Sequence, residues 1–322
     1  MQKINIFISV TPFHNFIINV LCNADFQADS NYIISSVPYH PDYTGTPLII
    51  PNSFAGKIKG LRRARKFIKD TVRTHGRGVE IFLPHIDGVL GNYVFHSPFL
   101  RRHGIKVHFF YEGIALLDAT RADREYSRNF GIKFALSFMI GYVFRIHKDI
   151  LPLEDKRISK IFTPEPALTP GPASKMVKIE FPRSRYHVEK GVCMIMGLNE
   201  APEIEQLNAH VLDFVMGRQD IHKVYFKPHP SDKQNVFERV AEQKAFTYQP
   251  ITSSYCIEEI ISEYNPEFVV CPYLSSGLIN LKFMYREEIH VICIINESSI
   301  AFSGADNLKF AKDNGIEIIS FR

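Results

Sequence analysis

The 322-residue sequence predicts an α/β protein made of two doubly wound domains. Three observations support this class. Short, apolar, strand-like segments alternate with longer helix-like segments, as in parallel sheets covered by helices. This alternation occurs once in each half of the chain. Between the halves, five prolines and one glycine fall within residues 163–182, a composition typical of a connection between domains.

The first half opens with an apolar segment at 4–10 that has the pattern of a buried strand. Thr11 follows as the expected N-cap of a helix, with Pro12 in its first turn, where the missing N–H costs nothing. Further strands are expected at 32–36, 47–50, 80–83 and 107–111, and helices at 57–74, 88–103 and 126–147.

The second half repeats the alternation after the proline-rich connection. Two such halves predict twin Rossmann-like domains, which we place at 1–165 and 188–322, with a linker at 166–187. Ligands of these sheets bind beyond the carboxyl ends of the strands. Strands are expected at 191–196, 223–227, 268–271, 290–295 and 316–320, and helices at 204–216, 255–264, 278–285 and 306–312.

The composition is that of a soluble globular protein, with 45% hydrophobic and 22% charged residues and a net charge of +4. This mild charge does not by itself require nucleic acid or a membrane as a partner. Five cysteines lack metal-ligand spacing, and their odd number suits a reduced compartment. Three of them, Cys193, Cys271 and Cys293, are expected to be buried hydrophobic residues. No signal peptide is recognisable, and the apolar stretch 134–146 is shorter than the roughly 20 residues of a membrane span. We therefore expect a cytoplasmic protein.

A rigid histidine follows the expected strand at 223–227, in the sequence Lys227-Pro228-His229-Pro230. The two prolines restrict the backbone on either side of the imidazole. A histidine beside a lysine can donate hydrogen bonds to a phosphate oxygen and neutralise its charge. A tight turn with an incidental surface histidine is the simpler interpretation, but the adjacent lysine at a strand end favours a function.

Paired serines open a helix after the strand at 268–271. Ser275 and Ser276 precede Gly277 and the helical segment 278–285. Serine hydroxyls and the backbone N–H groups at a helix N-terminus are ligands for an anion. Taken alone, the serines indicate an ordinary N-cap. Taken with the Lys-Pro-His-Pro turn, they predict a phosphate site that the two turns contact from opposite sides.

A third candidate lies in the first half, where Glu112 and Gly113 follow the strand at 107–111. A carboxylate at a strand end could accept a proton from a sugar hydroxyl. Taken alone, a capping or surface glutamate is the simpler interpretation.

A basic segment at 57–77 holds nine lysine and arginine residues with apolar residues between them. Such a helix suits the surface of an anionic membrane or a solvated helix face. Nucleic-acid binding is disfavoured because few aromatic residues interleave. The sequence has no dinucleotide fingerprint after its first strand, no Walker loop, no His-Glu-x-x-His, no Gly-x-Ser-x-Gly and no Asp-x-Asp, which disfavours the enzyme classes that use those motifs.

An acidic-Gly motif, a His-Pro motif and a paired-serine motif occur in that order. This set resembles the bacterial lipooligosaccharide sialyltransferases and capsule polysialyltransferases, over roughly residues 4–295. The resemblance implies a GT-B fold, in which two Rossmann-like domains face each other across the active site. The first domain would bind the acceptor, and the second would bind the nucleotide-sugar donor.

The resemblance also implies roles for single residues. The donor would be CMP-sialic acid, and its phosphate would be held by His229 and by Ser275 and Ser276. Glu112 would be the general base on the acceptor hydroxyl, and transfer would invert the configuration without a metal ion or other cofactor. The residues assigned to CMP binding are Lys227, His229, Pro230, Gly197, Asn199, Ser275 and Ser276.

The family motif carries two acidic residues before the glycine, and here Tyr111 occupies the first of these positions. If the base belongs at that position, Asp118, Asp123 or His14 are alternative candidates.

Four functions are therefore compatible with the sequence. The first is a sialyltransferase that modifies a terminal sugar, galactose, of a surface glycan such as lipopolysaccharide or O-antigen. Its acceptor could be lipid-linked, and the basic segment 57–77 would then touch the inner face of the cytoplasmic membrane. The others are a transferase for another CMP-activated nonulosonate or Kdo, a nucleotide-sugar epimerase, and a non-catalytic protein of a polysaccharide pathway.

Overall fold

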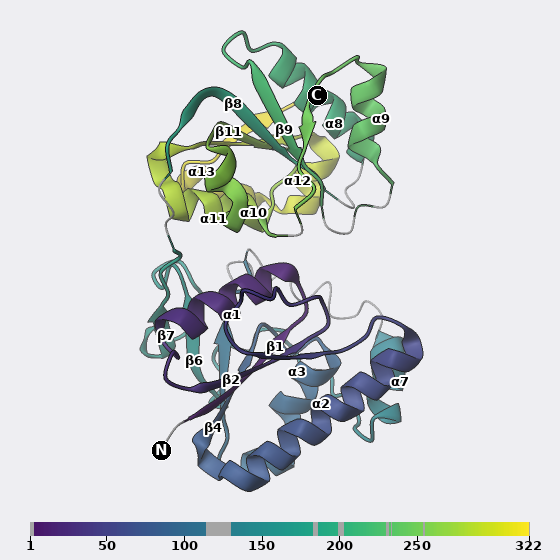
Figure 1. The fold of residues 1–322 in the computed structure, drawn as a ribbon, viewed down its shortest axis with the longest axis vertical. Coiled ribbons are helices and arrows are strands. Elements are labelled where there is room, and N and C mark those ends of the chain that lie inside the picture. The colour runs from purple at the N-terminus through teal and green to yellow at the C-terminus, as the bar shows by residue number, and fades with distance from the viewer. Residues whose placement is uncertain are drawn as a thin grey trace. The chain divides into compact units, whose positions relative to one another are not determined.

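The computed structural model describes residues 3–113, 130–182, 186–198, 203–229, 232, 234–253 and 255–321. The chain divides into two compact units, Met1–Phe181 and Pro182–Arg322. Each unit contains one parallel sheet with helices packed against it (Figure 1).

The first unit is built on a seven-stranded sheet in the order β3-β2-β1-β4-β5-β6-β7, and all neighbouring strands are parallel. β1 and β4 are buried along their whole length, as expected where helices cover both faces of a sheet. The strands are β1 (Ile4–Ser9), β2 (Ser30–Ser35), β3 (Thr46–Ile49), β4 (Val79–Leu83), β5 (Lys106–Phe110), β6 (Ile158–Thr163) and β7 (Met176–Lys178).

The first helix begins as the sequence predicts, because the Thr11 hydroxyl accepts the His14 N–H at 3.2 Å. The single helix expected at 88–103 is instead two helices, because Ser97 caps a new helix whose first residue, Pro98, cannot continue the preceding one. The helix expected to run to 147 ends at Met139, before Gly141 turns the chain with a φ of 72°. The helices are α1 (Pro12–Ala24), α2 (Phe54–His75), η1 (Gly76–Gly78), α3 (Val89–His96), α4 (Pro98–Arg102), α7 (Phe130–Met139) and η2 (Ala173–Lys175).

The boundary between the units falls inside the predicted linker 166–187. Within that range, β7 pairs in parallel with β6 and forms the edge of the first sheet. Neither β6 nor β7 is expected from the sequence, and two of the six residues of β6 are exposed, which weakens the apolar signal of a buried strand.

The second unit contains a six-stranded parallel sheet in the order β10-β9-β8-β11-β12-β13. Its core holds the stacked rings of Phe226 and Phe237, whose centroids are 3.8 Å apart. As expected, Cys193, Cys271 and Cys293 are fully buried. The strands are β8 (Glu189–Met196), β9 (Lys223–Lys227), β10 (Gln249–Pro250), β11 (Pro266–Cys271), β12 (His290–Ile295) and β13 (Glu317–Ser320).

The helices of the second unit follow the predicted alternation, with two additions, α9 and α12. They are α8 (Ile204–Met216), α9 (Val236–Gln243), α10 (Ile257–Tyr264), α11 (Ser276–Tyr285), η3 (Arg286–Glu288), α12 (Glu297–Ser303) and α13 (Ala305–Asp313). Over the described ranges, no helix combines the length and the apolar character needed to cross a bilayer.

Both sheets have the strand order of a Rossmann domain, in which the chain reverses direction beside the first strand. The reversal lies between β1 and β4 in the first sheet and between β8 and β11 in the second. Ligands of such sheets bind at this position, beyond the carboxyl ends of the strands.

Candidate functional site

Three adjacent strands of the second sheet, β9, β8 and β11, carry the predicted donor-site residues at their carboxyl ends. His229 follows β9, Gly197 follows β8 and Ser275 follows β11. The Gly197 N–H donates to the Lys227 carbonyl at 2.8 Å, which joins the first two turns. A Cβ on Gly197 would lie 3.1 Å from the His229 nitrogen and 3.0 Å from the Phe226 ring. The glycine therefore allows the histidine turn to approach the end of β8.

The serine turn lies on the other side of β8. The Ser275 hydroxyl caps α11 and accepts the Leu278 N–H at 3.4 Å, and Ser276 is the first residue of that helix. A Cβ on Gly277 would lie 2.7 Å from the terminal carbon of Met196, the last residue of β8. The N-terminus of α11 is thus packed directly against the strand end that also contacts His229. The predicted phosphate-binding turns flank β8 at the position where the chain reverses.

His229 is partly buried, and this burial lowers the pKa of its imidazole. Lys227 lowers the same pKa further, while Asp232 opposes the change. The Asp232 N–H donates to the His229 carbonyl at 2.9 Å. The ring is accordingly neutral at neutral pH and can donate one N–H to an anion, and a bound phosphate would favour its protonation.

The Lys227 ammonium is directed to the protein backbone. It donates to the Ser253 carbonyl at 2.8 Å and so ties the end of β9 to the segment that follows β10. The residue is buried, and this burial lowers the pKa of its amine. Lys227 adds positive charge near the histidine turn, and the contact that the structure shows for it is structural. Two further residues assigned to CMP binding, Asn199 and Pro230, lie outside the described residues.

In the first unit, Glu112 is enclosed by two histidines that come from different strand ends. His85 follows β4, and its Nε2 lies 3.4 Å from the Glu112 Oε1. His14 lies in the first turn of α1 after β1, and its Nε2 is 3.9 Å from the same oxygen. The cluster therefore occupies the reversal point of the first sheet, which corresponds to the position of the predicted phosphate-binding turns in the second.

Both imidazoles are held with a defined tautomer. The Nδ1 of His14 accepts the Val10 N–H at 3.3 Å, and the Nδ1 of His85 accepts the Asp87 N–H at 3.1 Å. In the neutral rings the proton is consequently on Nε2, the nitrogen that faces Glu112. The Glu112 carboxylate thus lies close to two Nε2 atoms at a strand end, where it could act as a general base.

Burial keeps these rings neutral. It lowers the pKa of His14 well below its ordinary value, with a further contribution from His85. Burial, together with the nearby Lys133, lowers the pKa of His85 to about 4. Lys133 is itself paired with Asp87, at 2.6 Å to each carboxylate oxygen.

The side chains of Tyr111 and Glu112 have different environments. Tyr111 is fully buried and packs edge-on against Phe13, with ring centroids 5.9 Å apart. Of the two positions, 112 is the one whose side chain meets the histidines. Asp118 and Asp123, two alternatives for the base, lie outside the described residues, whereas His14, the third, is part of the cluster itself.

His85 is not among the site residues that the sequence predicts. A signal for it was present, because Leu83-Pro84-His85 at the end of β4 has the same strand–Pro–His arrangement as Lys227-Pro228-His229 at the end of β9.

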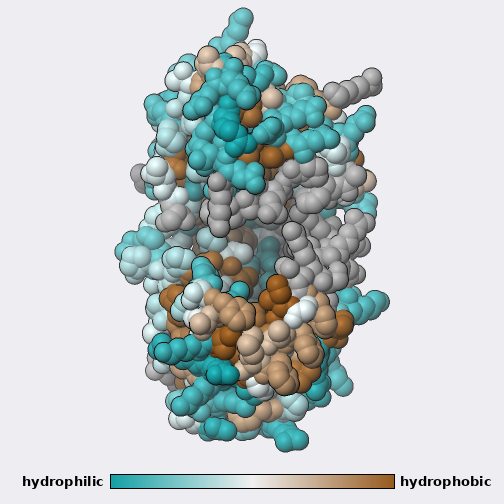
Figure 2. Space-filling view, turned by 90° about the vertical axis from the view of Figure 1, so that its right-hand side faces the viewer, coloured by the Kyte–Doolittle hydropathy of each residue, from teal (hydrophilic) through white to brown (hydrophobic). Residues whose placement is uncertain are grey.

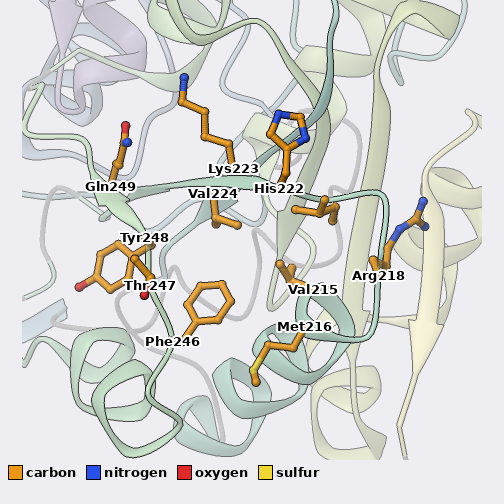
Figure 3. A pocket seen from close by; sticks show the side chains of 11 residues that line it. Val215, Met216, Arg218, His222, Lys223, Val224, Phe246, Thr247, Tyr248 and Gln249 are labelled. Atoms are coloured by element: carbon orange, nitrogen blue, oxygen red, sulfur yellow. The ribbon is translucent and has the colours of Figure 1, made fainter.

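A pocket of about 310 Å³ lies at the opposite edge of the second sheet. It is lined by the end of α8 and the starts of β9 and β10 (Figure 3). Phe246 and Val224 lie within it, and Lys223 and His222 stand beside them. Because it is at the amino ends of the strands, it is separate from the donor turns. In the described parts of the chain, no group of three or more His, Cys, Asp or Glu side chains could hold a metal ion.

No protein-family model and no curated protein matches the sequence. Solved structures do match the fold. The GT-B domain of a sialyltransferase from Photobacterium damselae matches with a TM-score of 0.57 at 8% identity, covering 98% of this chain and 100% of that chain. A UDP-glucosyltransferase from Polygonum tinctorium matches with a TM-score of 0.50 at 10% identity, covering 99% of this chain and 85% of that chain. MnaA of S. aureus, determined with UDP, matches with a TM-score of 0.51 at 11% identity, covering 91% and 79%. The chain has the GT-B fold, with two Rossmann-like domains.

Proposed function

We propose that this protein is a glycosyltransferase that moves sialic acid from CMP-sialic acid to a terminal sugar, galactose, of a bacterial surface glycan such as lipopolysaccharide or O-antigen. The reaction inverts the configuration and needs no metal ion. The second unit holds the donor and the first holds the acceptor.

The observation that carries the proposal is the pair of turns around the end of β8. The His229 turn and the α11 N-terminus with Ser275 and Ser276 both pack against this strand end, with Gly197 and Gly277 at the contacts. An imidazole N–H, serine hydroxyls and helix N–H groups are together suited to the phosphate of a nucleotide sugar. The match to a sialyltransferase GT-B domain supports sialic acid as the sugar.

The chemistry assigns one task to each cluster. The bond between the anomeric carbon and the CMP phosphate oxygen breaks, and CMP leaves with the electron pair. The phosphate clamp stabilises the charge that develops on that oxygen. The acceptor oxygen attacks the opposite face of the anomeric carbon, and its proton passes to Glu112. His14 and His85 orient the Glu112 carboxylate and remain neutral.

The tautomers of His14 and His85 favour an enzyme over a non-catalytic protein. Two buried rings, each locked by a backbone N–H, face one carboxylate at a ligand-binding strand edge. Perturbed titratable groups gathered at such an edge are typical of catalytic sites. We further propose that the acceptor is lipid-linked and that the basic residues within 57–77 contact the anionic inner face of the cytoplasmic membrane.

The test is incubation with CMP-sialic acid and a galactose-terminated oligosaccharide, followed by mass spectrometry of the acceptor. Gain of one sialic acid residue supports the proposal. Transfer from a different CMP-nonulosonate or CMP-Kdo, but not from CMP-sialic acid, would replace the donor. Epimerisation of a UDP-sugar would contradict the reaction class, and CMP binding without turnover on any donor would indicate a non-catalytic role.

Two variants separate the clusters. In Glu112→Gln, turnover should be lost while CMP affinity is kept, because the amide cannot take the proton. In His229→Ala, both turnover and CMP affinity should fall. Near-normal activity in Glu112→Gln would assign the base elsewhere, and normal CMP affinity in His229→Ala would overturn the donor site.

A further inference from the structure

The helix α7 (Phe130–Met139) is apolar around most of its circumference and yet lies largely at the surface. Its ten residues include one charge, Lys133, and its buried residues are Leu136 and Ser137. A helix of this composition is normally buried inside a protein. The side chains of Ile132, Phe134 and Phe138 are 58%, 42% and 70% exposed.

The segment after α7 also exposes apolar side chains. Val143 and Ile146 are 56% and 68% exposed, whereas Phe144 between them is buried and anchors the segment. We call the five exposed side chains the α7 surface: Ile132, Phe134, Phe138, Val143 and Ile146. Figure 2 shows apolar side chains gathered on the corresponding face of the first unit, the side on which α7 lies in Figure 1. Clusters of this kind mark interaction sites, because single surface apolar residues are normal but contiguous groups are not.

The α7 surface is firmly attached to the unit. Arg62 of α2 donates from Nε and Nη2 to the Met139 carbonyl, at 3.1 and 2.8 Å, and Arg65 donates to the Ile140 carbonyl. Asn92 of α3 donates to the Arg145 carbonyl at 2.8 Å and accepts the Arg145 N–H at 2.9 Å. The exposed side chains are therefore presented by an ordered backbone.

Most of the charged side chains near this surface are positive, although Lys133 is paired with Asp87 at 2.6 Å. Residues 130–148 include Lys133, Arg145 and Lys148 and contain no Asp or Glu. The neighbouring helix α2 carries eight lysine and arginine residues and a single acidic residue, Asp70. An apolar patch bordered by cations is complementary to a bilayer with anionic headgroups, where the apolar side chains reach the acyl boundary.

We propose that the α7 surface and the basic helix α2 form a docking site for an anionic lipid bilayer, into which Phe138, Ile146 and their neighbours insert. α7 spans about 15 Å at 1.5 Å per residue, half of a hydrocarbon core of about 30 Å, so it lies in the interface and does not cross. A second copy of the chain fits less well, because a two-fold contact would place the same cations opposite each other. This inference rests on the membrane contact proposed above for residues 57–77 and adds α7 to it, and its test requires no donor or acceptor.

The test measures sedimentation of the full chain with vesicles of phosphatidylcholine, with and without phosphatidylglycerol. The protein should bind the anionic vesicles and be released by salt. The double substitution Phe138→Glu and Ile146→Glu should weaken binding at least about tenfold, since burial of one such side chain contributes about 1.5–3 kcal/mol. The matched control is Met216→Glu with Leu168→Glu, which changes the charge equally at apolar residues that are 56% and 38% exposed and lie outside the α7 surface.

Two further measurements complete the test. Reversing the charges of Lys59 and Arg63 should weaken binding to the anionic vesicles, because both are exposed on α2 and neither makes the hydrogen bonds by which Arg62 and Arg65 hold the segment after α7. Turnover on a soluble oligosaccharide should be equal in the Phe138/Ile146 variant and the unmodified protein, which separates docking from catalysis and shows that the variant is folded. Equal vesicle binding by the variant and the control overturns the proposal. Absence of vesicle binding, or a dimer in light scattering that the variant abolishes, overturns it as well.

Discussion

Gly197 lies against the backbone nitrogen of His229, so closely that a Cβ at position 197 would be 3.1 Å away. The Gly197 N–H also donates to the carbonyl of Lys227, which lies two residues before His229. The glycine thus determines how near the histidine turn lies to the end of β8. Gly197 contributes to the proposed donor site because it has no side chain that would push the histidine turn away.

Substituting Gly197 by alanine should displace the His229 turn by a few tenths of an ångström and weaken CMP binding. We expect a loss of about tenfold, since hydrogen bonds to a charged group contribute about 1.5–3 kcal/mol and depend on geometry. Isothermal titration calorimetry with CMP measures the effect. Gly78→Ala is the control, because no atom lies within 4 Å of its added Cβ. Equal CMP affinity in both variants would separate Gly197 from the donor site.

The affinity for CMP should rise as the pH falls below neutral. Burial lowers the pKa of His229 in the free protein, and a bound phosphate raises it again, so binding takes up a proton. One proton changes the affinity by at most about tenfold per pH unit. The rise should be lost in His229→Asn, because protonation of CMP itself lowers the charge of its phosphate and does not favour binding. Identical pH dependence in the two proteins would show that His229 does not meet the phosphate.

His85 should affect turnover through the Nε2–H that faces Glu112. His85→Asn removes that donor and should lower turnover about tenfold without changing CMP affinity, whereas His85→Gln, whose amide nitrogen is near the Nε2 position, should restore much of the rate. Equal rates in the two variants would indicate a purely structural role.

Glu259 should make the stability fall as the pH rises from about 4.5 to 7. Burial raises the pKa of this carboxyl to about 7 in the folded protein, from 4.5, against the opposing hydrogen bond from the Cys256 N–H. Between these values the folded state holds more protons than the unfolded state, so stability is lost with rising pH. Glu259→Gln, which keeps the capping acceptor, should gain in melting temperature relative to the unmodified protein across that range. Glu263→Gln, an exposed change on the same helix, is the control. If the melting temperatures of Glu259→Gln and of the unmodified protein changed in parallel with pH, the assignment would be contradicted.

Lys227 should contribute to stability as well as to the donor site. Its buried amine donates to the Ser253 carbonyl, and Lys227→Met leaves that carbonyl without this donor. We expect a loss of about 1–3 kcal/mol in the free energy of unfolding. Urea denaturation measures it. Unchanged stability together with weakened CMP binding would instead place the amine at the phosphate.

The sequence was sufficient to predict the two-domain α/β class, because buried parallel strands give continuous apolar segments. The Thr11 cap and the helix opened by Ser275 and Ser276 were also predictable, since both follow from local chemistry between neighbouring residues. A serine cap followed by proline also marks the start of a new helix at Ser97-Pro98. This helix break was not predicted, because the apolar pattern continues across it.

The candidate sites were less predictable because they depend on strand order. Nothing local to Glu112 reveals His14 or His85, which lie far away in the chain and meet it through the pairing of β1, β4 and β5. The contact of Lys227 with Ser253 likewise depends on the position of β10 beside β9. The weak apolar pattern of β6 concealed a strand of the first sheet, which pairs in parallel with β5.

The position of β8 between β9 and β11 has a consequence for how the protein is made. β8 leaves the ribosome first, β9 follows, and β11 with α11 arrives last of the three. Until α11 has packed against Met196, the nascent chain has the His229 turn in place but lacks Ser275 and Ser276 beside it. The proposed capacity to retain a nucleotide phosphate would therefore be acquired late in synthesis, and chains truncated before α11 should lack it even if their earlier strands have paired.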